Sequence, residues 1–527
     1  MNTKLIFGSA LISFLQLNGA AETAPASKDK KPNILIILAD DLGYGDVQCY
    51  NPQRGKIPTP NIDRLATQGM RFTDGHSSSA VCSPSRYTLL TGRYHWRSRL
   101  QSGIVNLFEE PLIAPDRLTI AGLAKQHGYR TGCIGKWHLG WDWPIDTTQR
   151  KLFRTASKVN KDDEAPVATS ANRKEWHDIF SKPIAGGPTT RGFDSYFGTD
   201  VPNWPPFCFI ENDRTIGIPT EFLPPENYIN NLASLRGPAL KDWKLENILP
   251  ALGEHAVNFI AGSSKNPAPF LLYLPLTSPH TPIAVLEPWK GKSGLNGYAD
   301  LVMETDALVG QVLDALEKSD MVDNTIVIFT SDNGCAPYIG AEALEAKGHY
   351  PSGYLRGYKG DAWEGGHRIP FIVRWPGVVK PASICNQLVE QADLMATFAA
   401  ILSTKLPDNA GEDSYSMLPL LKGRDKPIRE SAVNCSLTGV PSLREGKWKL
   451  ISGKANGGFT KLADDHKIKL YNLTDDPGET VNLASDQPGR VEEMRAMLEK
   501  IIASGRSTPG KQQENDVKVR RYPAAGK

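Results

Sequence analysis

Two acidic segments are the clearest candidates for chemistry in this sequence. Asp40-Asp41 directly follows the apolar run 33–39 (NILIILA), and Asp332-Asn333 follows the apolar run 325–330. Neighbouring carboxylates repel one another unless a cation lies between them, and hard divalent ions such as calcium prefer carboxylate and amide oxygens. An Asp-Asp pair or an Asp-Asn-Gly turn on its own is more often a solvated turn. If both segments lie at one edge of a sheet, they supply a four-oxygen metal site.

A cysteine at the expected start of a helix is the second candidate. Ser83 and Pro84 suit a helix cap and first turn, and Gly92 suits the helix end. Cys82 would then lie at the helix N-terminus, where free N–H groups and the helix dipole favour an anion. Arg86 lies one turn further along and can point back toward it. A cysteine without these neighbours is more often simply buried or in a disulfide.

Positively charged side chains follow the same pattern of strand ends. Lys136 and His138 follow a predicted strand at 129–134, and His280 follows one at 270–276, whereas Lys359 precedes a predicted strand at 369–374. A single lysine or histidine in a loop is usually solvated. Loops that leave one sheet edge together predict a site for an anion instead.

The elements that must position these residues alternate along the chain. Near-continuous apolar runs predict strands buried on both faces, and capped or amphipathic segments predict helices at 59–69, 119–127 and 301–316. Such alternation predicts an α/β fold around a mostly parallel sheet. The carboxyl edge of such a sheet is where ligands bind.

The segment CSPSRYTLLTG resembles the signature of the type I sulfatase family. Further segments carry the same resemblance across nearly the whole chain: NILIILADDLGYGD, GKWHLG, SPHTP, IFTSDNG, YKGDAWEGGHRIPFIVRWPG and KLYNLTDDPGE. The resemblance implies an alkaline-phosphatase-like sandwich with a smaller C-terminal subdomain. It also implies that a maturation enzyme oxidises Cys82 to formylglycine.

The resemblance further implies a role for each candidate residue. One calcium ion is expected on Asp40, Asp41, Asp332, Asn333 and the side chain at position 82. In the implied mechanism, one oxygen of the hydrated formylglycine attacks sulfur and the other later expels sulfate, while Asp332 can accept the diol proton. Arg86 and Lys136 are expected to hold the formylglycine oxygens, and Lys136 with Lys359 to neutralise sulfate. His280 is expected to protonate the leaving alcohol, and His138 to act as base in the elimination.

Polar and aromatic loops are candidates for the substrate pocket, although ordinary loop packing explains them equally well. The candidate sugar-binding residues are His95, Arg97, Asp200, Asn203 and Trp204. These loops resemble those of bacterial carbohydrate sulfatases, which implies exo action on sulfated galactose or N-acetylgalactosamine, with O4 as the expected sulfate position. Two alternatives remain: a phosphatase or phosphonate monoester hydrolase of the same superfamily, and a non-catalytic glycan-binding protein if Cys82 is not matured.

The N-terminus predicts export. Lys4 precedes the apolar run 5–17 and the small residues 19–21, a pattern typical of a signal peptide at 1–21. The mature protein is then secreted, or periplasmic in a Gram-negative bacterium. No later segment is apolar enough to predict stable membrane insertion. Export permits disulfides among the seven cysteines, and the odd count leaves at least one unpaired.

The expected organisation after the signal peptide is a polar tether (22–31), a catalytic domain (32–426), an α+β subdomain (427–505) and a mobile tail (506–527). Strands at 447–452 and 467–472 and a helix at 491–504 are predicted in the subdomain. The net charge of +2 provides no broad basic field for nucleic acid. The oligomeric state is left open.

Overall fold

The computed structural model describes Met1 and residues 30–154, 166–228 and 233–522. The predicted signal peptide and most of the tether therefore lie outside the described residues. Among the described residues, no helix has the length and hydropathy needed to cross a membrane. All seven cysteines fall within the described part of the chain, and every one is a free thiol.

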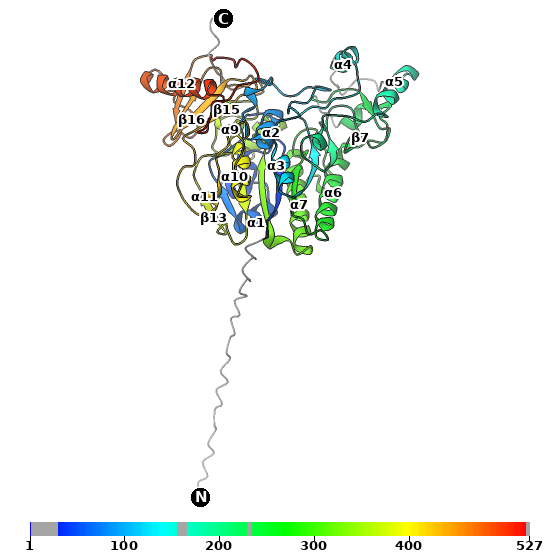
Figure 1. The fold of residues 1–527 in the computed structure, drawn as a ribbon, viewed down its shortest axis with the longest axis horizontal. Helices are drawn as coiled ribbons and strands as arrows, with labels where there is room; N and C mark the ends of the chain where they lie inside the picture. Colours follow the sequence, from blue (N-terminus) through cyan, green and yellow to red (C-terminus); the bar gives the residue numbers. More distant parts are fainter. Residues whose placement is uncertain (2–29, 155–165, 229–232, 523–527) are drawn as a thin grey trace.

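A ten-stranded mixed sheet forms the centre of the molecule (Figure 1). Its strands, in spatial order, are β13 (Ser383–Cys385), β2 (Met70–Phe72), β12 (Phe371–Arg374), β11 (Thr325–Ser331), β1 (Asn33–Ala39), β10 (Phe270–Pro275), β4 (Arg130–Lys136), β5 (Ser195–Thr199), β6 (Ile210–Glu211) and β7 (Arg214–Thr215). From β11 to β5 every neighbouring pair is parallel, whereas β12 runs antiparallel to β11. The predicted mostly parallel sheet is therefore present.

Strand β1 is apolar on both sides because both faces of the sheet are covered. Ile34, Ile36 and Leu38 belong to one core, and Leu35 and Ile37 to the other. The first core includes α2 (Cys82–Thr91), α3 (Ile120–Gln126) and α10 (Leu394–Ile401), and the second includes α1 (Pro60–Gln68), α6 (Ile248–Ser263) and α7 (Gly297–Lys318). Helices on both faces exclude water from the strands and leave their carboxyl ends as the accessible edge.

The remaining elements surround this sheet. They are α4 (Thr147–Arg154), α5 (Ser170–Phe180), α8 (Ala341–Ala346), α9 (Glu364–His367), α11 (Leu418–Leu421), and the short pairs β3 (Gly75–His76) with β14 (Val389–Glu390) and β8 (Glu221–Phe222) with β9 (Pro238–Ala239). In Figure 1 the described chain enters β1 from the bottom, so the carboxyl ends of the parallel strands point to the top. The α4–α5 region and the C-terminal elements both lie at that end.

A second, antiparallel sheet forms the C-terminal part. It contains β15 (Ser431–Cys435), β16 (Pro441–Glu445), β17 (Trp448–Ile451) and β18 (Lys469–Asn472), and α12 (Pro488–Ala503) packs on it. Strand β15 is bonded directly to the segment before α2, because Cys435 N donates to Ser78 O and Ala80 N to Cys435 O. This arrangement sets the C-terminal sheet beside the start of α2.

The tail, which was predicted to be mobile, makes specific contacts with the rest of the protein. Residues 506–522 follow the surface of the protein and are held by hydrogen bonds to distant residues. Asp516 pairs with the buried Arg93 at 3.0 Å, and Asn515 accepts from Arg97 at 3.0 Å. The basic, polar composition suggested a solvated end, but the acidic and amide residues within it bond to buried arginines.

Candidate active site

Five neighbouring strand ends supply the site. Asp40 follows β1, Asp332 follows β11, His280 follows β10 by a short turn, and Lys136 is the last residue of β4. Lys359 reaches the same edge because β12 is antiparallel, so the segment before it arrives at the carboxyl ends of its neighbours. The predicted convergence of these loops at one sheet edge is confirmed.

Three carboxylates and three cations alternate in this cluster. The side-chain N–O distances are 2.7 Å from Lys136 to Asp40, 2.7 Å from Lys359 to Asp41, and 2.8 Å from Arg86 to Asp332. Arg86 also lies 3.4 Å from Asp40. All six side chains are buried, so these contacts operate with little solvent screening.

The pKa values of the carboxyl groups reflect this crowding. Burial alone would raise the pKa of Asp40, but Lys136, His280, Arg86 and Lys359 outweigh it and hold the pKa well below its usual range. Burial and the nearby Asp40 charge raise the pKa of Asp332 to about 7. The third carboxyl is thus difficult to ionise beside the other two unless further positive charge is present.

The donor set fits a hard divalent cation. Asn333 donates from Nδ2 to Asp41 at 2.8 Å, and its Oδ1 is buried with no hydrogen-bond partner among the described residues. An orphaned amide oxygen beside three crowded carboxylates is what a cation with oxygen ligands would satisfy. Asp40, Asp41, Asp332 and Asn333 can therefore hold such an ion, and the Cys82 sulfur and the His280 ring lie close to the first two carboxylates. The five-ligand calcium site that includes position 82 stays a prediction.

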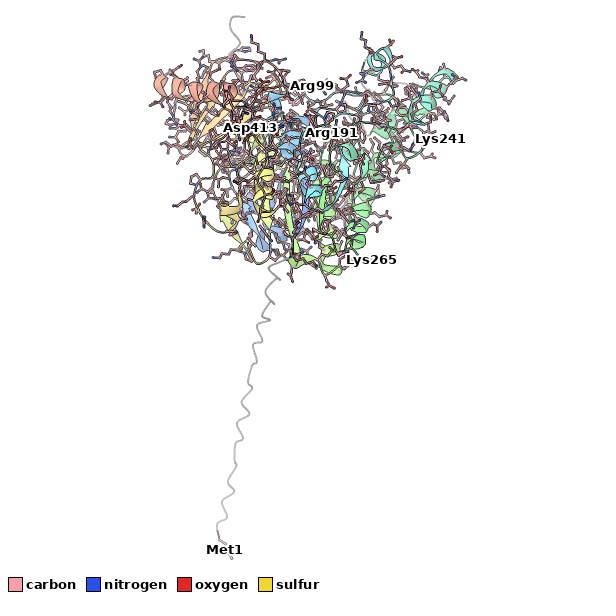
Figure 2. All side chains as sticks on the ribbon, viewed as in Figure 1. Met1, Arg99, Arg191, Lys241, Lys265 and Asp413 are labelled. Carbon is pink, nitrogen blue, oxygen red and sulfur yellow. The ribbon has the colours of Figure 1, made fainter. Side chains whose placement is uncertain are left out.

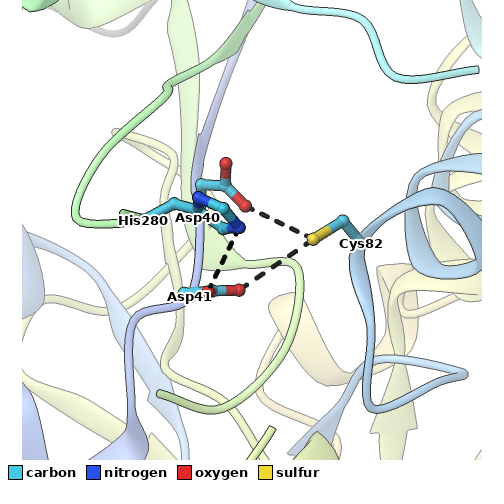
Figure 3. Close-up of side chains that lie close together, drawn as sticks. All are labelled: Asp40, Asp41, Cys82 and His280. Atoms are coloured by element: carbon cyan, nitrogen blue, oxygen red, sulfur yellow. Dashed lines mark hydrogen bonds and ion pairs between the residues drawn. The ribbon is translucent and has the colours of Figure 1, made fainter. Parts of the chain in front are cut away.

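The Cys82 thiol faces the same two carboxylates. Its Sγ lies 3.6 Å from Asp40 Oδ1 and 3.9 Å from Asp41 Oδ1 (Figure 3). Cys82 is itself the first residue of α2, with Val81 at the N-cap, so the predicted cap by Ser83 is wrong. The Ser83 hydroxyl instead accepts from Val105 N at 3.1 Å. Burial raises the pKa of the thiol, although Lys136 and Lys359 oppose the shift, so unmodified Cys82 is a poor nucleophile at neutral pH.

Each of the two histidines has one ring nitrogen bonded to the backbone. His280 Nδ1 contacts Thr281 O, which leaves Nε2 facing Asp41 Oδ2 at 3.6 Å (Figure 3). His138 Nε2 donates to Val105 O at 3.1 Å, which leaves a buried Nδ1 without a partner among the described residues. Burial and Lys359 lower the pKa of His280 to about 4, and burial and Lys136 hold the pKa of His138 well below its usual range. His138 is therefore neutral, with an unprotonated Nδ1.

A hydrogen-bonded chain beneath Asp41 escaped the sequence predictions. Asp46 accepts from Tyr298 at 2.5 Å and lies 2.9 Å from His349, while the Tyr298 hydroxyl also donates to Asp41 O at 3.3 Å. Asp41 has a positive φ of 65°, a conformation that costs energy for a residue with a side chain and needs such support. The only signal in the sequence was that Asp46 ends the same acidic segment, LADDLGYGD.

The predicted sugar-binding residues divide into two groups. Asp200 accepts from His138 N at 3.1 Å, and the Trp204 ring lies 5.8 Å from the His138 ring, so these two lie next to the cluster. Asn203 is buried and donates to Ala233 O at 2.9 Å.

Arg97, in contrast, is already paired with another residue. It is wholly buried and forms an ion pair with Asp413 at 2.8 Å. Asp413, labelled in Figure 2, lies between α2 and the C-terminal elements. His95 is also buried, and burial lowers its pKa to about 3. A substrate contact by Arg97 would compete with this internal ion pair, and the sugar-binding role of both residues stays a prediction.

A second group of possible metal ligands is already paired with the ammonium group of a lysine side chain. His76, Glu364 and His367 lie close together and are buried. The Lys449 ammonium lies 3.0 Å from Glu364 and 3.2 Å from His367 Nε2. This group therefore works as a buried ionic link between α9 and β17.

Comparisons with known proteins agree with this geometry. A family model described as Sulfatase matches residues 32–404, and one described as N-sulphoglucosamine sulphohydrolase, C-terminal, matches residues 359–507. An N-acetylgalactosamine-6-O-sulfatase of Bacteroides thetaiotaomicron is 34% identical over 94% of this chain and 98% of its own length. Human arylsulfatase A is 30% identical over 90% of this chain and 87% of its own length.

The fold has close counterparts among solved structures. One of them, described under the metabolism of multiple glycosaminoglycans by Bacteroides thetaiotaomicron, is 32% identical with a TM-score of 0.75. The match covers 90% of this chain and 99% of that one. The predicted alkaline-phosphatase-like α/β fold with a smaller C-terminal subdomain is confirmed.

Proposed function

Because the chain belongs to the sulfatase family and hydrolyses sulfate esters, we propose that it is an exo-acting carbohydrate sulfatase that uses calcium and a formylglycine at position 82. The observation that carries the proposal is the buried cluster of alternating carboxylates and cations around Cys82. With three charges of each sign, the cluster is neutral by itself. A divalent cation in the same space leaves an excess positive charge that suits a sulfate group.

Calcium is the proposed ion because most of the available ligands are hard oxygens. Asp40, Asp41, Asp332 and the orphaned Oδ1 of Asn333 would hold it together with a formylglycine oxygen at position 82, and His280 lies beside Asp40, Asp41 and Cys82. When bound, the ion supplies positive charge that polarises the sulfate and relieves the repulsion among the carboxylates.

Formylglycine at position 82 is supported by the inertness of the thiol. A buried cysteine whose pKa is raised cannot attack a sulfate ester at neutral pH, whereas a hydrated aldehyde supplies one oxygen to attack sulfur and another through which sulfate is released. This proposal requires a formylglycine-generating maturation enzyme as a partner.

The surrounding side chains then have distinct tasks. Lys136 and Lys359 orient the sulfate oxygens and balance their charge. Arg86 is fixed by its hydrogen bonds to Asp332 and to Lys136 O, and from there it positions the formylglycine at position 82. His138 presents an unprotonated Nδ1 and can take up a proton during sulfate release. His280 has its Nδ1 hydrogen on Thr281 O, so a proton for the leaving alcohol comes from Nε2 once the imidazole is fully protonated.

The proposed substrate is a sulfated galactose or N-acetylgalactosamine at a chain end. The Bacteroides thetaiotaomicron relative described above is an N-acetylgalactosamine-6-O-sulfatase. This similarity favours O6 as the sulfate position over the O4 position expected from the loops. Asp200 and Trp204, beside His138, are the proposed sugar contacts among the predicted residues. From the N-terminal sequence we also propose export, to the periplasm or out of the cell. Sulfated glycans are encountered in those compartments.

A defined substrate panel tests the function. The full chain, co-expressed with a formylglycine-generating enzyme, is incubated with 6-O- and 4-O-sulfated galactose, N-acetylgalactosamine and N-acetylglucosamine, and with an aryl sulfate and the matching aryl phosphate and phosphonate. We expect sulfate release from a galacto-configured sugar, and none from the Cys82→Ala control. Faster turnover of the phosphate or phosphonate would instead favour the alternative hydrolase, and binding of sulfated sugar without turnover by matured protein would favour a glycan-binding protein.

A further inference from the structure

Two exposed aromatic side chains lie beside Lys359 and have no part in the chemistry described above. Tyr338 belongs to the short helix η9 (Pro337–Ile339), and Phe459 lies in the loop between β17 and β18. They are 48% and 40% exposed, and their rings meet edge to face with centroids 5.8 Å apart. Large apolar side chains that remain exposed together mark a binding surface more often than isolated ones do.

Tyr338 is tied to the sulfate-binding end of the site. Its helix follows the Asp332-Asn333 turn, and Lys359 N donates to Cys335 O at 2.9 Å, which draws the two segments together. The Lys359 ammonium lies close enough to the Tyr338 phenol to oppose the rise in its pKa that burial causes. The same ammonium pairs with Asp41, one of the two carboxylates that face Cys82. Only the Lys359 side chain therefore separates the Tyr338 ring from the cluster.

Phe459 is brought to this place by the C-terminal sheet. Its loop is clamped onto the turn after Lys359, because Gly457 N donates to Asp361 Oδ1 at 2.8 Å and Ala362 N donates to Ala455 O at 2.8 Å. A Cβ atom on Gly360 would lie 2.8 Å from the Phe459 ring. The ring therefore rests directly on the backbone next to Lys359.

We propose that Tyr338 and Phe459 form an aromatic wall that packs against the apolar C–H face of the sulfated sugar ring. The lysine holds the charged end of the substrate, and the adjacent rings offer the sugar an apolar surface of fixed orientation. The wall draws one residue from each part of the chain, so substrate recognition requires both sheets. Trp204, beside His138, contacts the substrate from a different strand end. This inference rests on the proposed carbohydrate sulfatase function.

Kinetics of matched variants test the wall. Phe459→Ala and Tyr338→Ala are compared with Phe459→Trp and Tyr338→Phe on the best sulfated monosaccharide of the panel, with inhibition by inorganic sulfate measured in parallel. We expect each alanine variant to lose about tenfold in kcat/KM, mostly through KM, a factor that corresponds to about 1.4 kcal/mol of lost ring burial. The aromatic replacement Phe459→Trp should retain activity within about threefold.

The parallel readouts separate the possible results. Inorganic sulfate has no ring to stack, so its inhibition constant should not change in Phe459→Ala. Tyr338→Phe keeps the ring but removes the hydroxyl, so retained sugar binding in this variant assigns the effect to the ring. Ile384→Ala in β13, an exposed apolar residue at the far edge of the sheet, is the control and should match wild type.

Two outcomes overturn the inference, and they differ from each other. If wild type hydrolyses a sulfated sugar and both alanine variants match it, the wall has no part in recognition while the proposed function stands. If wild type hydrolyses aryl sulfates but no sulfated sugar, the proposed substrate class is wrong, and the inference of an aromatic wall for a sugar ring is wrong as well.

Discussion

Lys136 Nζ lies 2.7 Å from Asp40 Oδ2, and neither side chain has any exposed surface. A buried ion pair of this kind contributes little net stability, because removing both charges from water costs about as much as their attraction returns. Its value lies in placing a cation and a carboxylate that can bind a metal at the ends of β4 and β1, on either side of β10. The pair thus joins the sulfate-binding side of the site to the metal-binding side.

The Lys136→Ala substitution should abolish most activity and make folding depend on calcium. Loss of the ammonium removes the shortest ion pair of the buried Asp40 and leaves Arg86 at 3.4 Å, which costs up to about 3–5 kcal/mol when no cation replaces it. We expect kcat/KM for an aryl sulfate to fall at least about 100-fold. Thermal unfolding with and without EDTA provides the second measurement, and calcium should stabilise the variant more than wild type. An equal calcium shift in both proteins would contradict the assignment of Asp40 as a ligand.

The Cys82→Ala substitution should remove activity without harming the fold. The side chain makes only long contacts to Asp40 and Asp41, so little packing is lost. Turnover of an aryl sulfate should drop by about 10³-fold or more. Mass spectrometry of the tryptic peptide from active wild type should show the aldehyde at position 82. Full activity in protein whose peptide carries only the thiol would remove the basis of the mechanism.

The His280→Ala substitution should discriminate between leaving groups. A sugar alkoxide needs a proton as it departs, whereas an activated phenolate does not. We expect kcat for a sulfated sugar to fall about 100-fold or more, and kcat for 4-nitrophenyl sulfate to fall less than about tenfold. Both substrates are assayed on the same preparation, so equal losses would exclude the role of general acid.

The Arg97→Ala substitution should destabilise the protein without weakening substrate binding. Arg97 is buried against Asp413, and its removal leaves that buried carboxylate without its cation. We therefore expect the free energy of unfolding to fall by about 3–5 kcal/mol. KM, measured at a temperature where the variant is folded, should stay at the wild-type value. Arg99→Ala is the matched control, because Arg99 is 39% exposed in its pair with Glu109 and should cost less than about 1 kcal/mol. A raised KM in Arg97→Ala would show that Arg97 contributes to substrate binding after all.

Glu304 should make stability fall as the pH rises through neutrality. Burial raises the pKa of this carboxyl to about 7, and its Oε1 has no hydrogen-bond partner among the described residues. A raised folded-state pKa means that the protonated form is favoured in the fold, so the penalty for ionisation is absent below about pH 4.5 and complete above about pH 7. Glu304→Gln keeps an acceptor for Leu286 N and removes that penalty.

The comparison of unfolding at two pH values checks this prediction. Glu304→Gln should match wild type near pH 4.5 and exceed its stability at pH 8, by on the order of 1–2 kcal/mol in denaturant titrations. Other groups titrate over the same range in both proteins and cancel in the difference. A constant difference at the two pH values would show that Glu304 keeps an ordinary pKa.

The strand-end chemistry was accessible from the sequence because parallel strands bring their carboxyl ends to one edge. The run NILIILA alternates between the two cores, and the polar residues that follow it and follow β11 must therefore meet. Lys359 reached the same edge although it precedes its strand, because β12 is antiparallel. Cys82, Arg86 and the three carboxylates needed no further information.

Only the tertiary structure decided which polar residues were already committed to internal contacts. Arg97 lies near the nucleophile helix in sequence, yet its partner Asp413 comes from a distant segment, and no local pattern reveals that pairing. The tail bonds to buried arginines for the same reason. Tyr338 and Phe459 meet because two separate sheets dock against each other, and such docking depends on the shape of the packed surfaces rather than on local spacing. Local periodicity therefore identified the chemistry, and long-range packing determined what surrounds it.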